Sequence, residues 1–328
     1  MKQIMKVVFS IAFCFTLLSV NAQKDYPFVK EDNISKTYPA GNSLNIDNQF
    51  GKVEVITWNS NQIKVDVHIK VSATNNQGYA EELFNSIKVS DEKNGNDIFF
   101  KTSVEPNNRK CNSCSNNMSI DYTVHLPADT KLSIKNSFGG IVVPDYTGEL
   151  SIESKFGSLT AQTLSNIKKL HVEFGSATIA SLENVDASFK FSSVELNSLS
   201  GDNKLSIEFC NTTKIGLSGS IVSLSLNESY STVNLKPAPN LQASYKINTD
   251  FGSFKNRSNI DISRTDEPKQ YGPDSKKTYE GKSGNGSAKI NIKSSFGKII
   301  IGEPQPGDIK EKKQKNKDKD NDNDSEEI

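Results

Sequence analysis

Arginine and histidine are scarce in this sequence. Its 328 residues include three histidines and only three arginines, Arg109, Arg257 and Arg264, and 39 basic residues balance 39 acidic ones. Nucleic-acid-binding domains carry an excess of positive charge, and guanidinium groups are the usual ligands of phosphate and carboxylate groups. The composition therefore predicts no nucleic-acid partner.

Cysteine is also rare. Four cysteines occur, and Cys14 lies in an apolar leader, which leaves Cys111, Cys114 and Cys210 in the rest of the chain. Small secreted domains that depend on disulfides carry more cysteines than this. The fold must therefore be held together by backbone hydrogen bonds and an apolar core.

A long hydrophobic run occurs only near the start of the chain. Lys2 and Lys6 precede the apolar residues 7–20, and a small residue, Ala22, stands just before a suitable cleavage position. This arrangement is typical of a cleavable signal peptide, here residues 1–22, and Phe13 before Cys14 disfavours a lipid anchor. We therefore expect export to the periplasm, the cell surface or the medium, with no transmembrane segment after cleavage.

A Phe-Gly step recurs at a nearly fixed interval. From residue 138 the aromatic residue returns after 18, 18, 17, 18, 21 and 21 residues. A period of this length is typical of stacked supersecondary units. The full steps are Phe50-Gly51, Phe138-Gly139, Phe156-Gly157, Phe174-Gly175, Phe251-Gly252 and Phe296-Gly297, and the partial steps are Phe191-Ser192, Phe209-Cys210 and Tyr230-Ser231.

Apolar and polar residues alternate on both sides of each step. Leu132 and Ile134 precede the step at 138, and Ile141 and Val143 follow it. Period two indicates two short strands per unit, each with one buried face. The aromatic residue follows the last aliphatic residue by two or four positions, never by an odd number. It is therefore predicted to point inward, in a continuous interior column with one ring per rung.

The glycine of each step is predicted to form the corner between the two strands, because glycine adopts positive φ without steric penalty. Corners with Ser192, Cys210 or Ser231 in its place are expected to differ in shape. The pattern predicts an all-β fold, a single-stranded right-handed parallel β-helix or β-solenoid with rungs of 18–21 residues stacked ~4.8 Å apart. An antiparallel sandwich is the alternative, against which the regular period argues.

The flanks of the repeat define the organisation of the chain. Residues 61–126 break the period as a β-rich insertion, with strands predicted over 63–73, 97–105 and 119–127 and a short helix over 79–89. This insertion is expected to cover one end of the stack, because exposed solenoid ends invite edge pairing.

The predicted parts follow one another along the chain. They are a lead-in over 23–39, an adhesin-like solenoid domain over 40–303 with regular rungs over 127–256, a projecting polar loop over 257–285, a final rung over 286–302, and a disordered charged tail over 304–328.

Three stretches carry a resemblance to a known family. They are SIDYTVHLPADTKLSIKNSFGGIVV at 119–143, the successive FGS units, and YEGKSGNGSAKINIKSSFGKIIIG at 279–302. Over roughly residues 40–302 the chain resembles the bacterial putative-adhesin family, a β-solenoid domain of the DUF4097 type. The resemblance implies an exported β-helix of adhesin-like character, and it brings no catalytic or binding residues to transfer.

Cys111-Asn112-Ser113-Cys114 is the most suggestive short motif. It is compatible with a redox pair or with half of a zinc site, but a zinc site needs four ligands and a redox pair would open a helix. Here the motif lies in a polar loop between strands. The favoured interpretation is a local disulfide, or two thiols, that pins this loop, and Cys210 is expected to be a small buried residue.

Outward-pointing acids offer a second candidate. Glu153 and Glu173 are expected one rung apart, close enough for paired-carboxylate chemistry, yet glycosidases also need a cleft and a defined separation. A solvated charged face is the favoured interpretation. The acidic tail at 318–327 lacks the turn glycine of a calcium loop. The sequence therefore predicts no catalytic, cofactor-binding or metal-binding residues.

The leading interpretation is an exported, non-enzymatic, adhesin-like β-solenoid that serves as a binding or structural module of the cell surface or envelope. The partner is unknown, with a glycan or an envelope or surface protein as candidates. A periplasmic structural or signalling protein and a polysaccharide-active β-helix enzyme are the alternatives.

Overall fold

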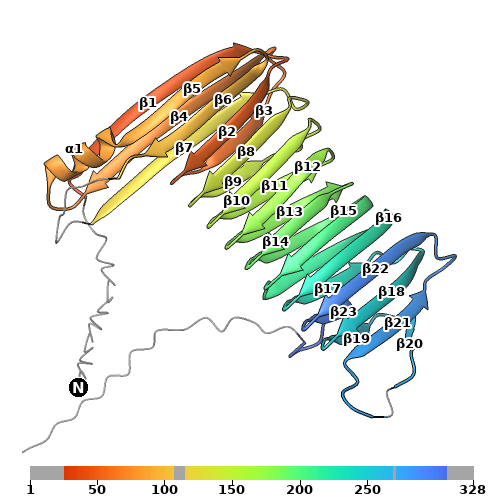
Figure 1. Ribbon diagram of the computed structural model, residues 1–328. Coiled ribbons are helices and arrows are strands. Elements are labelled where there is room, and N and C mark those ends of the chain that lie inside the picture. The colour runs from red at the N-terminus through yellow and green to blue at the C-terminus, as the bar shows by residue number, and fades with distance from the viewer. Residues whose placement is uncertain (1–25, 107–114, 269–270, 309–328) are drawn as a thin grey trace, which may run out of the picture.

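The computed structural model describes residues 26–106, 115–268 and 271–308. The predicted signal peptide, Cys111, Cys114 and nearly all of the charged tail lie outside these residues. The described part contains 23 strands and one helix, stacked into an elongated body (Figure 1). The predicted all-β, solenoid-like fold is confirmed.

Each rung contributes one strand to each of two parallel ladders, ladder A before the aromatic corner and ladder B after it. In spatial order, ladder A consists of β2 (Ser43–Gln49), β8 (Leu132–Ser137), β10 (Leu150–Lys155), β12 (Ile167–Glu173), β14 (Asp186–Lys190), the end of β15 (Ser193–Glu208), the end of β16 (Thr212–Ser229), β22 (Ala288–Ser295) and β18 (Ala243–Asp250). Ladder B consists of β3 (Val53–Thr57), β9 (Gly140–Val143), β11 (Ser158–Leu164), β13 (Ser176–Glu183), the start of β15, the start of β16, β17 (Thr232–Pro237), β23 (Lys298–Gly302) and β19 (Ser253–Arg257).

The core lies between the ladders and follows the predicted alternation. Leu132, Ile134, Ile141 and Val143 are at most 1% exposed. Equivalent positions face one another from rung to rung, as in the pairing of Ile134 with Ile152. Burying each such side chain stabilises the fold by about 1.5–3 kcal/mol. One continuous apolar column therefore supports every corner of the coil.

The insertion extends both ladders at the N-terminal end (Figure 1). Ladder A continues into β6 (Asp97–Val104) and ladder B into β7 (Asn116–Leu126), both in parallel. β5 (Ile87–Asn94), β4 (Gln62–Ala73) and β1 (Phe28–Pro39) then add in antiparallel pairs. The three predicted strands are confirmed. The helix, α1 (Gln77–Asn85), is confirmed too, but Ile87 begins β5 instead of ending the helix.

The C-terminal end does not follow chain order. β22 pairs with the end of β16 on one side and with β18 on the other. The last rung of the sequence therefore lies between the rungs of Tyr230 and Phe251. The predicted loop over 257–285 is also wrong in part, because it contains β20 (Asp261–Arg264) and β21 (Lys276–Lys282), which add antiparallel strands beyond β18.

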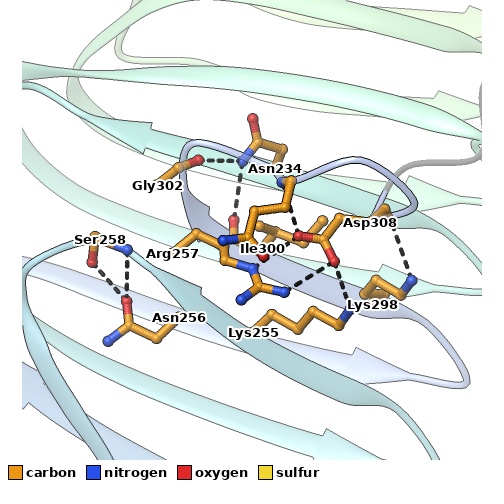
Figure 2. A network of polar contacts seen from close by, with 10 residues as sticks. Asn234, Lys255, Asn256, Arg257, Ser258, Lys298, Ile300, Gly302 and Asp308 are labelled. Carbon is orange, nitrogen blue, oxygen red and sulfur yellow. Dashed lines mark hydrogen bonds and ion pairs between the residues drawn. The ribbon is translucent and has the colours of Figure 1, made fainter.

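Asp308 holds the segment after β23 against ladder B (Figure 2). Its side chain is 3% exposed and lies 2.5 Å from Lys255 Nζ and 2.9 Å from Arg257 Nε. Its backbone carbonyl accepts a hydrogen bond from Lys298 Nζ at 3.0 Å. Arg257 and Lys255 hold the pKa of the Asp308 carboxyl well below its usual range. One of the few arginines in the chain is thus used to fix a structural segment.

Candidate functional site: an exposed aromatic ladder

The aromatic residues of the repeat form one unbroken stack, which we call the aromatic ladder. In spatial order the rings are Phe50, Phe138, Phe156, Phe174, Phe191, Phe209, Tyr230, Phe296 and Phe251. Neighbouring ring centroids are 4.7–5.2 Å apart, and their planes differ by at most 7°. Nine rings at one ring per rung span roughly 40 Å of the solenoid, given a spacing of about 5 Å between rungs.

The predicted interior position of these rings is wrong. Apart from the partly buried Phe50, the rings are 44–60% exposed. The alternation of inward and outward side chains holds only for extended backbone, and the backbone of each aromatic residue is not extended. Phe138, for example, has φ 60°, which turns its side chain outward just where alternation would have pointed it inward.

The glycines have a different role from the predicted one. Positive φ falls on each aromatic residue, whereas Gly139 and Gly157 do not have it. Glycine is required at these two corners because their backbone lies against the backbone of the preceding rung and leaves no space for a Cβ atom. A Cβ on Gly139 would lie 1.8 Å from the carbonyl oxygen of Gly51, and one on Gly157 would lie 1.9 Å from that of Gly139.

The three corners without glycine keep the same shape, contrary to expectation. The aromatic residues before Ser192, Cys210 and Ser231 have φ of 49–53°. The small side chains at these positions are buried and bond to the preceding rung. Ser192 Oγ accepts from the Gly175 amide at 3.2 Å, and Ser231 Oγ accepts from the Cys210 amide at 2.9 Å. Burial raises the pKa of the Cys210 thiol, so this cysteine is a packing residue.

The residue two positions before each aromatic residue points inward. Near the N-terminal end it is Asn136, whose Nδ2 donates to the carbonyls of Gly51 at 2.9 Å and Gly140 at 3.1 Å. Near the C-terminal end it is Glu228, which accepts from the Ser231 amide at 2.6 Å and from the Ser294 hydroxyl. Burial raises the pKa of Glu228 to about 7. On the middle rungs the equivalent residues are the apolar Val172, Phe189 and Ile207, so the buried polar residues lie toward the two ends of the stack.

A row of hydroxyl groups runs along one side of the ladder. It is formed by residues of ladder B that lie two or three positions after the ring, and we call it the hydroxyl row. Its members are Ser158, Ser176, Ser193, Thr212, Thr232 and Ser253. Lys298 interrupts this row between Thr232 and Ser253. All are exposed or half-buried. The recurring FGS units already contained this signal, because serine follows glycine at 158, 176 and 253.

A row of charged residues runs along the other side. Lys155, Glu173, Lys190 and Glu208 precede their rings on successive rungs and pair in register. Lys190 lies 3.1 Å from Glu208. We call these four residues the charged row. Two lysines and two glutamates give it no net charge, so it offers hydrogen-bond donors and acceptors without a strong electrostatic field.

The expected pairing of Glu153 with Glu173 is wrong. Glu153 lies opposite Lys135 and His171 in register, and Lys155 lies opposite Glu173. Glu153 is 3.1 Å from Lys155 Nζ. The acids therefore belong to different outward rows, and each has a cation beside it, as on a solvated face.

The ladder presents ring edges to solvent, because both faces of an internal ring are covered by its neighbours. Ring edges carry partial positive charge, and aromatic pairs contribute about 0.5–1.5 kcal/mol each beyond buried area. A long exposed apolar strip on a soluble protein commonly marks an interaction site. This strip is narrow and flat, with polar rows on both sides.

Several solved structures align with most of the length of this chain at low similarity. A putative adhesin from Bacteroides fragilis is 14% identical, with a TM-score of 0.39, and the match covers 82% of this chain and 97% of that one. A putative cell adhesion protein from Clostridium sporogenes is 16% identical, with a TM-score of 0.23 and coverage of 84% and 100%. A putative lipid binding protein from Parabacteroides distasonis is 8% identical, with a TM-score of 0.32 and coverage of 83% and 97%.

At such identities and TM-scores the similarity does not extend to function. The chain matches no family model, and a search of curated proteins gave no match. The resemblance to the DUF4097 type therefore stays a prediction. No helix within the described residues is long and apolar enough to cross a bilayer.

Proposed function

We propose that this chain is an exported, non-enzymatic, adhesin-like module that binds an extended glycan along the aromatic ladder. The observation that carries the proposal is the exposed, unbroken stack of nine rings between two polar rows. A glycan has apolar C–H faces and hydroxyl edges, so it matches an apolar strip with hydrogen-bonding groups on both sides. Ring edges, which carry partial positive charge, attract hydroxyl oxygens as well.

The spacing of the ladder argues against an extended peptide as its partner. Side chains on one face of a β-strand repeat every ~6.6–6.8 Å, whereas the rings repeat every 4.7–5.2 Å. A peptide strand would therefore drift out of register within two or three rungs. The neutral charged row also offers no field that would select a highly charged protein partner.

The enzymatic alternative lacks a paired-acid centre at Glu153 and Glu173. Replacing both by glutamine is expected to leave glycan binding and stability nearly unchanged, because exposed ion pairs contribute little. Release of reducing ends from xylan or mannan by the wild-type protein, and its loss in this double variant, would favour the enzyme instead.

Affinity electrophoresis tests the binding surface. The mature chain is run in gels that contain soluble xylan, mannan or dextran, beside the double variant F156G/F174G and the control V222S. Val222 is 56% exposed and lies outside the ladder. We expect at least one polysaccharide to retard the wild type and V222S, and to retard F156G/F174G much less. Equal mobility of all three proteins in every gel would contradict the proposal.

Location is tested separately, by protease treatment of intact and lysed cells. Digestion on intact cells would support surface display. Protection until lysis would place the protein inside the envelope and favour the periplasmic structural alternative.

A further inference from the structure

A second concave surface lies at the other end of the strands from the ladder. Turns from five separate segments enclose a hollow of about 780 Å³, which we call the turn hollow. The segments are residues 40–43, 58–61, 96–97, 127–131 and 147. Because it borders the start of β2 and follows the end of β3, β2 separates it from the ladder by roughly 20 Å. Its volume is typical of a small-molecule site.

The turns around the hollow are fixed to one another by backbone hydrogen bonds. Ala40 N–H donates to Asn61 O at 3.1 Å, and Ser43 N–H donates to Asn96 O at 2.8 Å. On the other side, Thr147 N–H donates to Ala128 O at 3.0 Å. The hollow is therefore preformed, which reduces the entropy that a ligand must overcome on binding.

Trp58, the only tryptophan in the chain, lines the hollow. Its backbone amide donates to Leu126 O at 3.0 Å, and its indole Nε1 donates to Gln62 O at 2.8 Å. The ring also packs on His125, with centroids 5.2 Å apart. Three contacts therefore hold in place the largest side chain among the residues that line the hollow.

Carboxamide groups are concentrated around this ring. Within the described residues, the side chains of Asn59, Asn61 and Asn96 are exposed and make no hydrogen bond to the protein. A carboxamide both donates and accepts, as does a sugar hydroxyl. The charged groups on the wall are Asp97, Asp129 and Lys131. Asp97 accepts a hydrogen bond from Ser43 Oγ, and Lys131, the single cation among these lining residues, lies 3.0 Å from Glu149. The wall therefore offers no cationic cluster for an anion.

We propose that the turn hollow binds a short neutral saccharide, with Trp58 as its apolar platform and Asn59, Asn61 and Asn96 as its hydrogen-bonding groups. This site is distinct from the aromatic ladder, and it does not depend on the ladder's proposed role. An adhesin-like protein with both sites would hold a chain end in the hollow and an extended chain along the ladder.

Tryptophan fluorescence, excited selectively over tyrosine, tests this site directly, because Trp58 is the only tryptophan in the chain. Neutral di-, tri- and tetrasaccharides of glucose, galactose, mannose and N-acetylglucosamine are titrated to millimolar concentration. We expect at least one to change the emission saturably. The double variant N59A/N61A should weaken that binding by roughly tenfold or more, since two hydrogen bonds are lost.

Two controls separate the hollow from the rest of the molecule. N197A removes an exposed asparagine from a distant rung and should bind like the wild type, and the ladder variant F156G/F174G should also keep the fluorescence response. The proposal is overturned if no saccharide changes the emission, if N59A/N61A responds like the wild type, or if calcium chloride alone reproduces the change.

Discussion

The backbone of Gly139 packs so closely on Gly51 that a methyl group at 139 would lie 1.8 Å from the Gly51 carbonyl oxygen. The same approach recurs at Gly157 and Gly175, each against the glycine of the preceding rung at 1.9 Å. At these three rungs glycine is repeated because the corners stack with no room for a side chain between them, whereas the corners at Ser192, Cys210 and Ser231 accommodate a small one.

This contact predicts a large difference between two adjacent glycines. Gly139→Ala should lower the free energy of unfolding by about 3 kcal/mol, because backbone would have to move. Gly140→Ala should leave stability unchanged or slightly raised, because the nearest atom to a Cβ there is Ser158 Oγ, at the ordinary contact distance of 3.4 Å. Urea unfolding of both variants checks this, and equal losses would refute the packing explanation.

The strained backbone of the rings predicts an inverted order of substitutions. Phe174 has φ 55° and stacks on two neighbours. Phe174→Gly and Phe174→Ala both lose the stacking, about 1–3 kcal/mol in total. The alanine variant should be less stable than the glycine variant by a further ~1 kcal/mol, because only glycine tolerates this φ freely. The same pair of substitutions at Ser188, in the regular strand β14, should show the opposite order.

The buried Glu228 predicts a stability that falls as pH rises. Its pKa is about 7 in the folded protein against 4.5 as the ordinary value. The folded state therefore binds the proton more tightly than the unfolded state. The stabilisation is fully present below pH 4.5 and is lost as pH rises through 7, by up to about 3 kcal/mol.

Glu228→Gln should remove this dependence between pH 4.5 and 8, because glutamine fills the same space without a charge. Thermal unfolding across that range measures the effect. The exposed Glu195→Gln is the control and should keep the wild-type slope. An unchanged slope in Glu228→Gln would show that this carboxyl is not the titrating group.

The ion pairs of Asp308 with Lys255 and Arg257 predict that acid loosens the segment after β23 and the strands it packs on. Arg257 and Lys255 hold the pKa of Asp308 below its usual range. Their stabilisation is therefore present above the ordinary carboxyl pKa of 3.8 and is lost as pH falls below it. Asp308→Asn should show the loss at neutral pH, as faster amide exchange in β19 and β23 and earlier cleavage after residue 302.

The exposed Asp261→Asn serves as the matched control and should exchange like the wild type. Exchange in β8 and β10, several rungs away, should be unaffected in both variants. A uniform increase along the whole solenoid would indicate general destabilisation instead of release of one segment.

The rungs could be predicted from the sequence because apolar and polar residues alternate along a strand that has one buried face. Leu132, Ile134, Ile141 and Val143 gave the core positions directly. The outward position of Phe138 could not be obtained in this way, because one residue in the left-handed region reverses the alternation.

The candidate sites were only partly visible for a related reason. The hydroxyl row repeats with the period, so Ser158 and Ser176 could have been found from their fixed distance to the ring. The turn hollow joins residues from segments up to about a hundred positions apart, such as Asn42 and Thr147. No periodic signal links them, and only the pairing of the insertion with β2 and β3 brings them together.

The displaced order of the last rungs constrains how the chain can be assembled. Rungs from Phe50 to Tyr230 can be laid down one after another as the polypeptide emerges. The rung of Phe251 cannot dock on that growing end, because its neighbour is β22, which is synthesised later. The terminal rungs must therefore be completed together, when β22 inserts between β16 and β18 and β23 inserts between β17 and β19. A chain that stops before residue 288 would leave Tyr230 and an unpaired edge at its growing end, so this end of the stack is completed only after β22 and β23 have been synthesised.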